Sequence, residues 1–143
     1  MKRMNRLALL LLSSSLLMPG IGFSGEALME IAPTTENGIT YVSGGIGEGQ
    51  AQAMMGMRKD YNLQLTFAMK GTGEYLADVK VNIQDAKGKE ILETVSSGPL
   101  FYAKLPQGRY KVTAEFNGKP LAKSTNIKAG RAKDLYFYWE KES

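Results

Sequence analysis

The 143-residue sequence contains no cysteine and no histidine, and it contains a single tryptophan. Without cysteine there are no disulfides, so stability has to come from the packing of apolar side chains. The missing histidine and cysteine also exclude zinc hydrolase ligand sets and the Ser-His-Asp and Cys-His catalytic arrangements. No pair of acidic residues has a spacing that indicates glycoside hydrolysis. We therefore expect no enzymatic activity and no cofactor.

Long apolar runs are absent except near the N-terminus. There, three basic residues precede an apolar run at residues 7–12, and the small residues Gly22 and Ser24 follow. This pattern is typical of a signal peptide cleaved after Ser24, with cleavage after Ala27 as the second choice. The run is shorter than the ~20 apolar residues of a membrane-spanning helix, and without cysteine no lipid anchor forms. We expect residues 1–24 to be removed and a soluble periplasmic or secreted product with no membrane span.

Neither sign of charge is in large excess after that cleavage. The chain has 18 basic and 14 acidic residues, and three of the basic residues lie in the predicted signal peptide. The remaining lysines are spread singly along the sequence, whereas nucleic-acid binding takes a basic stripe. We expect no nucleic-acid partner.

The remaining length suits one hydrophobic core and therefore one domain. Residues 25–37 show no sustained period and are expected to form a flexible lead-in, followed by a single domain at residues 38–143. The glycine-rich residues 44–49 lack the Gly-Lys-Ser/Thr ending of a phosphate loop, so a connector is favoured over an anion site.

One short helix is expected near residues 50–59. Ala51, Met54 and Met55 recur at the spacing of one helical face, which predicts that this face is apolar. Gly56 is expected to interrupt or weaken the helix.

From residue 61 onward the hydrophobic period changes to two. Strands are expected at residues 39–43, 63–67, 79–83, 90–95, 101–105, 110–116, 122–128 and 135–139. Clean alternation is typical of antiparallel sheets with one buried face, and strand starts about 9 to 13 residues apart from residue 79 onward favour a β-sandwich. Asn117 and Gly118 suit a two-residue hairpin turn.

Several of these segments resemble the carboxypeptidase regulatory-like family. They are residues 79–88, Thr94, residues 98–101 and, most recognisably, Leu-Pro-Gln-Gly-Arg-Tyr-Lys-Val at residues 105–112. The resemblance covers roughly residues 61–139 and implies an all-β fold, a transthyretin-like antiparallel β-sandwich of about seven strands. It also implies a usually non-catalytic module of exported bacterial proteins that contacts carbohydrate or protein. Hydroxyisourate hydrolases share this fold but rely on histidines and a Tyr-Arg-Gly-Ser C-terminus, which this sequence lacks.

The last predicted strand carries the candidate binding residues, Tyr136 and Tyr138. If Leu135, Phe137 and Trp139 point into the core, alternation places the two tyrosines on the outer face. Two neighbouring phenol rings suit the stacking of a sugar or contact with a protein. The alternative is that the predicted helix packs on this face and buries both tyrosines.

Met54, Met55 and Met57 are candidates for a soft-metal site, because thioethers bind Cu(I). Two of them lie on the predicted apolar helix face, where methionine is an ordinary packing residue, so we expect no metal site. Residues 85–90 resemble a calcium loop only superficially. Lysines stand where oxygen ligands are needed, which favours a hairpin turn.

Together these patterns predict a non-enzymatic, exported binding or interaction module of the bacterial cell envelope. The expected partner is an envelope or extracellular protein. The alternative is a carbohydrate-binding module that uses Tyr136 and Tyr138.

Overall fold

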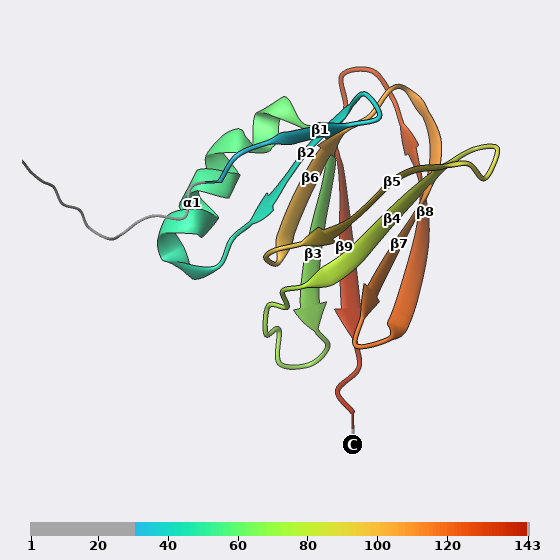
Figure 1. The fold of residues 1–143 in the computed structure, drawn as a ribbon. Helices are drawn as coiled ribbons and strands as arrows, with labels where there is room; N and C mark the ends of the chain where they lie inside the picture. The colour runs from blue at the N-terminus through green and yellow to red at the C-terminus, as the bar shows by residue number, and fades with distance from the viewer. Residues whose placement is uncertain (1–30, 143) are drawn as a thin grey trace, which may run out of the picture. The chain divides into compact units, whose positions relative to one another are not determined.

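The computed structural model describes residues 31–142, which form two β-sheets and one α-helix (Figure 1). The predicted signal peptide and the first part of the predicted lead-in lie outside the described residues. Within residues 31–142, none of the helices has the length and apolar character needed to cross a membrane.

Sheet A has the strand order β1-β2-β6-β3-β9, and sheet B has the order β5-β4-β7-β8. Neighbouring strands are antiparallel except β3 and β9, which are parallel. The elements are β1 Thr34–Glu36, β2 Ile39–Gly44, α1 Gly47–Met57, the 3-10 turn η2 Arg58–Asp60, β3 Leu63–Met69, β4 Val79–Asp85, β5 Glu90–Ser96, β6 Leu100–Lys104, β7 Gly108–Phe116, β8 Lys119–Ile127 and β9 Lys133–Trp139. The predicted fold class, an antiparallel β-sandwich with one short helix, is confirmed, although the described residues form nine strands rather than about seven.

The strand that the sequence analysis did not predict is β1, at the end of the expected flexible lead-in. Asn37 and Gly38 have φ angles of 53° and 77°, and two successive positive values are what a type I′ hairpin turn requires. The turn folds the chain back so that Glu36 pairs with Ile39 of β2. The expectation for residues 25–37 is therefore corrected, because the last of them belong to sheet A.

The main core lies between the two sheets, where the predicted alternation places one face of each long strand. Its fully buried members are Leu63, Leu65, Phe67, Val79, Val81, Ile83, Phe101, Ala103, Val112, Ala114 and Phe137. Complete burial of a large apolar side chain stabilises a fold by roughly 1.5–3 kcal/mol. This interior supplies the stability of a domain that has no disulfides.

A second, smaller cluster lies on the opposite, outer face of sheet A. There Met54 of α1 packs against Val42, Tyr61 and Tyr102, and all four side chains are buried. This contact seats the helix over β2 and β6, on the left-hand side of Figure 1. The rest of the outer face, toward β9, is not covered by these contacts.

The helix begins and ends earlier than expected and runs through Gly56. Its start is fixed by Gln50, whose side-chain oxygen accepts the N–H groups of Gly45 and Ile46 at 3.1 Å each. These two N–H groups of the glycine-rich loop are therefore hydrogen-bonded to a side chain of the same protein. The predicted apolar face is also narrower than expected, because Met55 is 62% exposed.

The Leu105 to Tyr110 corner connects sheet A to sheet B. The Tyr110 hydroxyl donates a 2.6 Å hydrogen bond to the carbonyl oxygen of Pro106, and Gly108, at φ 152°, lies beside the ring. The Asn62 side chain holds the N–H and C=O of Leu105 at 2.9 and 2.8 Å. These contacts explain why the corner combines proline, glycine and tyrosine at this spacing.

Replacing Tyr110 by Phe is expected to lower the free energy of unfolding by about 1–2 kcal/mol at pH 7, because the hydrogen bond to Pro106 is lost. Burial, and to a smaller degree Asp85, raises the pKa of the Tyr110 phenol. The hydrogen bond of the Tyr110 hydroxyl thus contributes fully to the free energy of unfolding below about pH 10, the pKa of the phenol in the unfolded chain. This contribution is lost as the pH rises through the higher pKa of the folded state. Urea unfolding from pH 7 to 11 measures both effects.

The control for this variant is Tyr41→Phe, the same chemical change at a hydroxyl whose hydrogen bonds are long, 3.4 and 3.5 Å. We expect a change of less than about 0.5 kcal/mol there. Equal losses in the two variants would show that the Tyr110 hydroxyl does not hold the corner.

Candidate functional site

The uncovered part of the outer face of sheet A forms a groove between α1 and β9, which we call the tyrosine groove. Its volume is about 210 Å³, and its lining includes Tyr75, Tyr102 and Tyr136 together with Met55 and Arg58. These side chains come from the strands β6 and β9, from α1 and η2, and from the loop before β4, so the groove exists only in the folded domain.

Strand register explains how the tyrosines come together. Thr66 of β3 lies opposite Tyr136 of β9, and Ala68 lies opposite Tyr138. On the other side of β3, Ala68 forms an isolated antiparallel bridge with Tyr75. Directly opposed residues share one face of a sheet, so Ala68 lies between Tyr75 and Tyr138, and Thr66, which lines the groove, lies between Leu100 and Tyr136.

Tyr136 and Tyr138 have the orientation that the alternation predicts. They are 44% and 50% exposed, whereas Phe137 between them is fully buried. Their rings are nearly parallel, at 9°, with centroids 6.2 Å apart. The alternative of burial beneath the helix is not what the structure shows, because α1 packs on Tyr102 instead.

A polar network closes one end of the groove. The Arg58 guanidinium donates to both carboxylate oxygens of Asp134, at 2.7 and 2.8 Å, and its Nε donates to Gln64 at 2.6 Å. Gln64 is only 6% exposed, and its amide nitrogen donates to the carbonyl oxygens of Arg58 and Tyr61. Both bonds to Asp134 come from one nitrogen, Nη2, so the orientation of the guanidinium is fixed by Asp134 and Gln64 together, through two different nitrogens. Arg58 and Asp134 remain about two-fifths exposed, so their outer edges face solvent.

The electrostatic balance of the groove is close to neutral. Arg58 and Asp134 are charges of opposite sign in direct contact. Burial raises the pKa of the Tyr102 phenol; Arg58 acts against this shift, and Asp134 adds to it. The Tyr102 phenol therefore stays protonated at neutral pH, and it lies beside a compensated ion pair.

The three methionines proposed from the sequence occupy different surroundings. Met54 is buried under α1, Met57 packs against the same cluster, and Met55 is exposed at the groove. Among the described residues no group of three or more histidine, cysteine, aspartate or glutamate side chains could hold a metal ion. Residues 85–90 form a hairpin turn, as predicted, in which Asp85 accepts the N–H groups of Lys87 and Lys89.

The sequence analysis missed Tyr75. It lies in residues 70–78, where no period indicates a strand. The available signal was the pair Gly71 and Gly73, both at positive φ, which turn the chain back along β3 and bring Tyr75 beside Ala68.

Comparisons with known proteins give little beyond the fold. No protein-family model matches the chain, and no curated protein is similar to it. The structure of Klebsiella pneumoniae 5-hydroxyisourate hydrolase is similar over 57% of this chain and 90% of its own length, at 18% identity and a TM-score of 0.45. The resemblance to the carboxypeptidase regulatory-like family remains a prediction.

This likeness corrects one expectation. The similar structure is that of an enzyme, which contradicts the prediction that the chain has no enzymatic activity. We therefore no longer describe this chain as non-enzymatic. Identity at this level indicates neither a substrate nor a catalytic residue here.

Proposed function

We propose that this chain is an exported binding module of the bacterial cell envelope and that its ligand is a carbohydrate held in the tyrosine groove. The observation that carries the proposal is the exposed, nearly parallel pair Tyr136 and Tyr138, of which Tyr136 lines the groove and Tyr138 lies beside it on the same face of β9. Sugar rings place their apolar faces on aromatic side chains, and phenol rings supply such a surface together with a polar tip. The signal-peptide pattern of residues 1–24 supports export.

The polar end of the groove favours the same ligand class. Arg58 is held by Asp134 and Gln64, and both Arg58 and Asp134 keep exposed edges, which suits hydrogen bonding to hydroxyl groups. Their charges compensate each other, so the groove favours a neutral glycan over a charged one.

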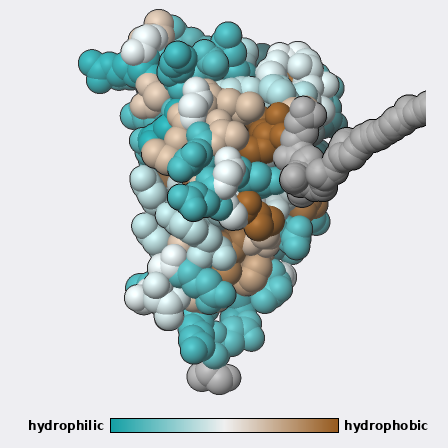
Figure 2. All heavy atoms as spheres, turned by 90° about the vertical axis from the view of Figure 1, so that its left-hand side faces the viewer, coloured by the Kyte–Doolittle hydropathy of each residue, from teal (hydrophilic) through white to brown (hydrophobic). Residues whose placement is uncertain are grey.

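The surroundings favour a glycan over a protein partner. Figure 2 views the side that carries α1; in the part of this face that the described residues show, hydrophilic side chains lie between the hydrophobic areas. A specific protein interface usually buries about 800 Å² on each partner around an apolar centre. A groove of about 210 Å³ better fits a short stretch of sugar.

A glycan array with the purified protein tests this proposal. We expect binding to at least one class of neutral glycan. Because aromatic contacts contribute about 0.5–1.5 kcal/mol each, Tyr136→Ala/Tyr138→Ala is expected to weaken binding about tenfold. Titration calorimetry with the strongest array ligand measures the change.

Two controls separate the groove from the rest of the surface. Tyr136→Phe/Tyr138→Phe keeps both rings and is expected to bind within about threefold of the parent, because stacking is the main contact. Val95→Ala removes an exposed apolar side chain of β5 and is expected to have no effect on binding. Failure of every glycan, or unchanged binding by the double alanine variant, would leave a protein ligand as the competing explanation and refute the carbohydrate proposal.

A further inference from the structure

A large cavity at one end of the sandwich carries a strong positive charge. Its volume is about 820 Å³, and it is lined by Lys59, Lys104, Lys128 and Arg131, with Asp60 as the single lining carboxylate. The four cations come from η2, the end of β6 and the loop between β8 and β9. Basic residues that are scattered along the sequence are therefore gathered at one place by the fold.

The cavity stays open because small residues surround the cations of the β8–β9 loop. Ala129, Gly130 and Ala132 alternate there with Lys128 and Arg131. Gly130, at φ 73°, allows the tight turn, in which the Arg131 N–H donates to the Lys128 carbonyl oxygen at 3.2 Å. The short side chains leave space that the two long basic side chains do not fill.

None of the four cations is neutralised within residues 31–142. The ion pairs of that range involve Arg58, Lys70 and Lys119. Four positive charges and one negative charge around a single concave surface create a field that attracts anions, and a cavity concentrates such a field.

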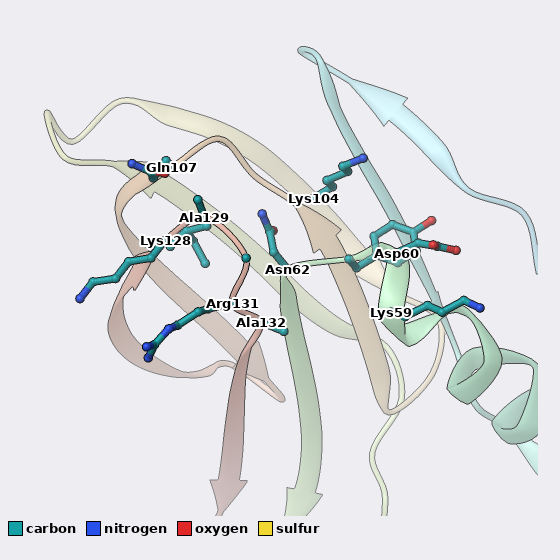
Figure 3. A pocket seen from close by; sticks show the side chains of 12 residues that line it. Lys59, Asp60, Asn62, Lys104, Gln107, Lys128, Ala129, Arg131 and Ala132 are labelled. Atoms are coloured by element: carbon teal, nitrogen blue, oxygen red, sulfur yellow. The ribbon is translucent and has the colours of Figure 1, made fainter.

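Figure 3 shows how the cations are arranged around this cavity. Lys128 and Arg131 extend on one side of Asn62; Lys104 and Lys59 lie on the other side, with Asp60 between them. Asn62 itself is held by hydrogen bonds to Leu105, so the floor between the two sides is rigid. A ligand with several anionic groups is therefore needed to contact cations on both sides.

We propose that this cavity binds a multiply charged, phosphate-bearing ligand. Arginine binds phosphate through two parallel hydrogen bonds, and lysine binds it as a point charge, so this set of side chains suits phosphate groups at both sides. The site is separate from the tyrosine groove in its lining residues and in the charge of its ligand. Free polyphosphate and the phosphate head groups of lipids share this chemistry.

Titration of the purified protein with sodium tripolyphosphate, and separately with inorganic phosphate, tests the proposal. We expect tripolyphosphate to bind more tightly than inorganic phosphate and to bind less tightly as salt rises, since salt screens exposed charges. Lys128→Ala/Arg131→Ala is expected to weaken tripolyphosphate binding about tenfold or more, because charge-assisted hydrogen bonds are lost.

The matched control is Lys87→Ala/Lys89→Ala in the β4–β5 turn. It removes the same charge from exposed positions outside the cavity, and the backbone N–H bonds of this turn to Asp85 do not need the lysine side chains. We expect near-parental binding from this variant and from Tyr136→Ala/Tyr138→Ala. No binding of tripolyphosphate or of anionic vesicles, or equal losses in the cavity and turn variants, would overturn the proposal.

Vesicles distinguish the two sources of phosphate. Phosphatidylcholine vesicles with and without phosphatidylglycerol are sedimented with the protein. Binding that requires phosphatidylglycerol and is lost in Lys128→Ala/Arg131→Ala assigns the cavity to lipid head groups. Binding of tripolyphosphate alone assigns it to a soluble phosphate ligand.

Discussion

Replacing Phe67 by Ala is expected to lower the free energy of unfolding by about 3–5 kcal/mol. Phe67 is fully buried in the middle of β3, and its ring centroid lies 6.0 Å from that of Phe137 and 6.1 Å from that of Trp139. The substitution leaves a cavity between the two sheets, and an interior without disulfides has no covalent link to limit the damage.

Urea unfolding followed by tryptophan fluorescence and circular dichroism measures this loss. The control is Tyr138→Ala, which removes an aromatic ring from the neighbouring strand but from the exposed face of the same sheet. Its expected cost is about 1 kcal/mol or less, from cross-strand contacts alone. Similar losses in both variants would mean that the two faces of sheet A do not differ as the burial pattern indicates.

Gly98→Ala is expected to destabilise the domain by about 3 kcal/mol or more, or to prevent folding. A Cβ at this position would overlap the carbonyl oxygen of Gly44 and lie 2.5 Å from its carbonyl carbon. Both atoms belong to the backbone, so β2 itself has to move. The Ser96 hydroxyl donates to the Gly98 carbonyl oxygen at 2.7 Å and holds the turn in place.

Gly56→Ala is the matched control for this steric prediction. Gly56 lies in α1, has no neighbouring atom within 4 Å of the added Cβ and is not among the positive-φ glycines. Alanine there is expected to raise the free energy of unfolding by about 0.5–1 kcal/mol, because glycine is a poor helix former. The same substitution is thus expected to lower the free energy of unfolding at Gly98 and to raise it at Gly56. A stability of Gly98→Ala close to that of the parent would contradict the packing of this turn against β2.

The close approach of Gly98 to Gly44 also bears on the site. Gly44 ends β2, and only two residues separate it from α1, which forms one side of the tyrosine groove. A shift of β2 therefore moves the helix relative to Tyr136. We expect weakened glycan binding in any folded fraction of Gly98→Ala.

The strands of the core were predictable because local sequence determines which face of a strand is buried. In β9 the apolar Phe137 alternates with Tyr136 and Tyr138, and this order alone places the two tyrosines outside. Turn chemistry was equally local: Asn117 and Gly118 have the positive φ angles that the hairpin between β7 and β8 needs.

The composition of the site was not predictable, because it depends on which strands are neighbours. The alternation of β9 does not reveal that it pairs in parallel with β3, or that Ala68 brings Tyr75 to the other side of the groove. The cations of the basic cavity lie as far apart in sequence as Lys59 and Arg131, and only the tertiary fold joins them. The periodicity of a strand predicts which of its faces is buried, whereas the residues that meet in a site depend on the order of the strands in the sheet.

The central claim is that a carbohydrate binds on the outer face of sheet A, over Tyr136 and Tyr138. Amide chemical-shift mapping by NMR, with the strongest ligand from the array, tests it most directly. The account predicts that the shifted amides cluster on β3 and β9 around Thr66, Ala68 and the two tyrosines, and that Tyr136→Ala/Tyr138→Ala needs about tenfold more ligand to produce the same shifts. Shifts confined to sheet B or to the β8–β9 loop, or an unchanged titration curve in the double variant, would contradict it.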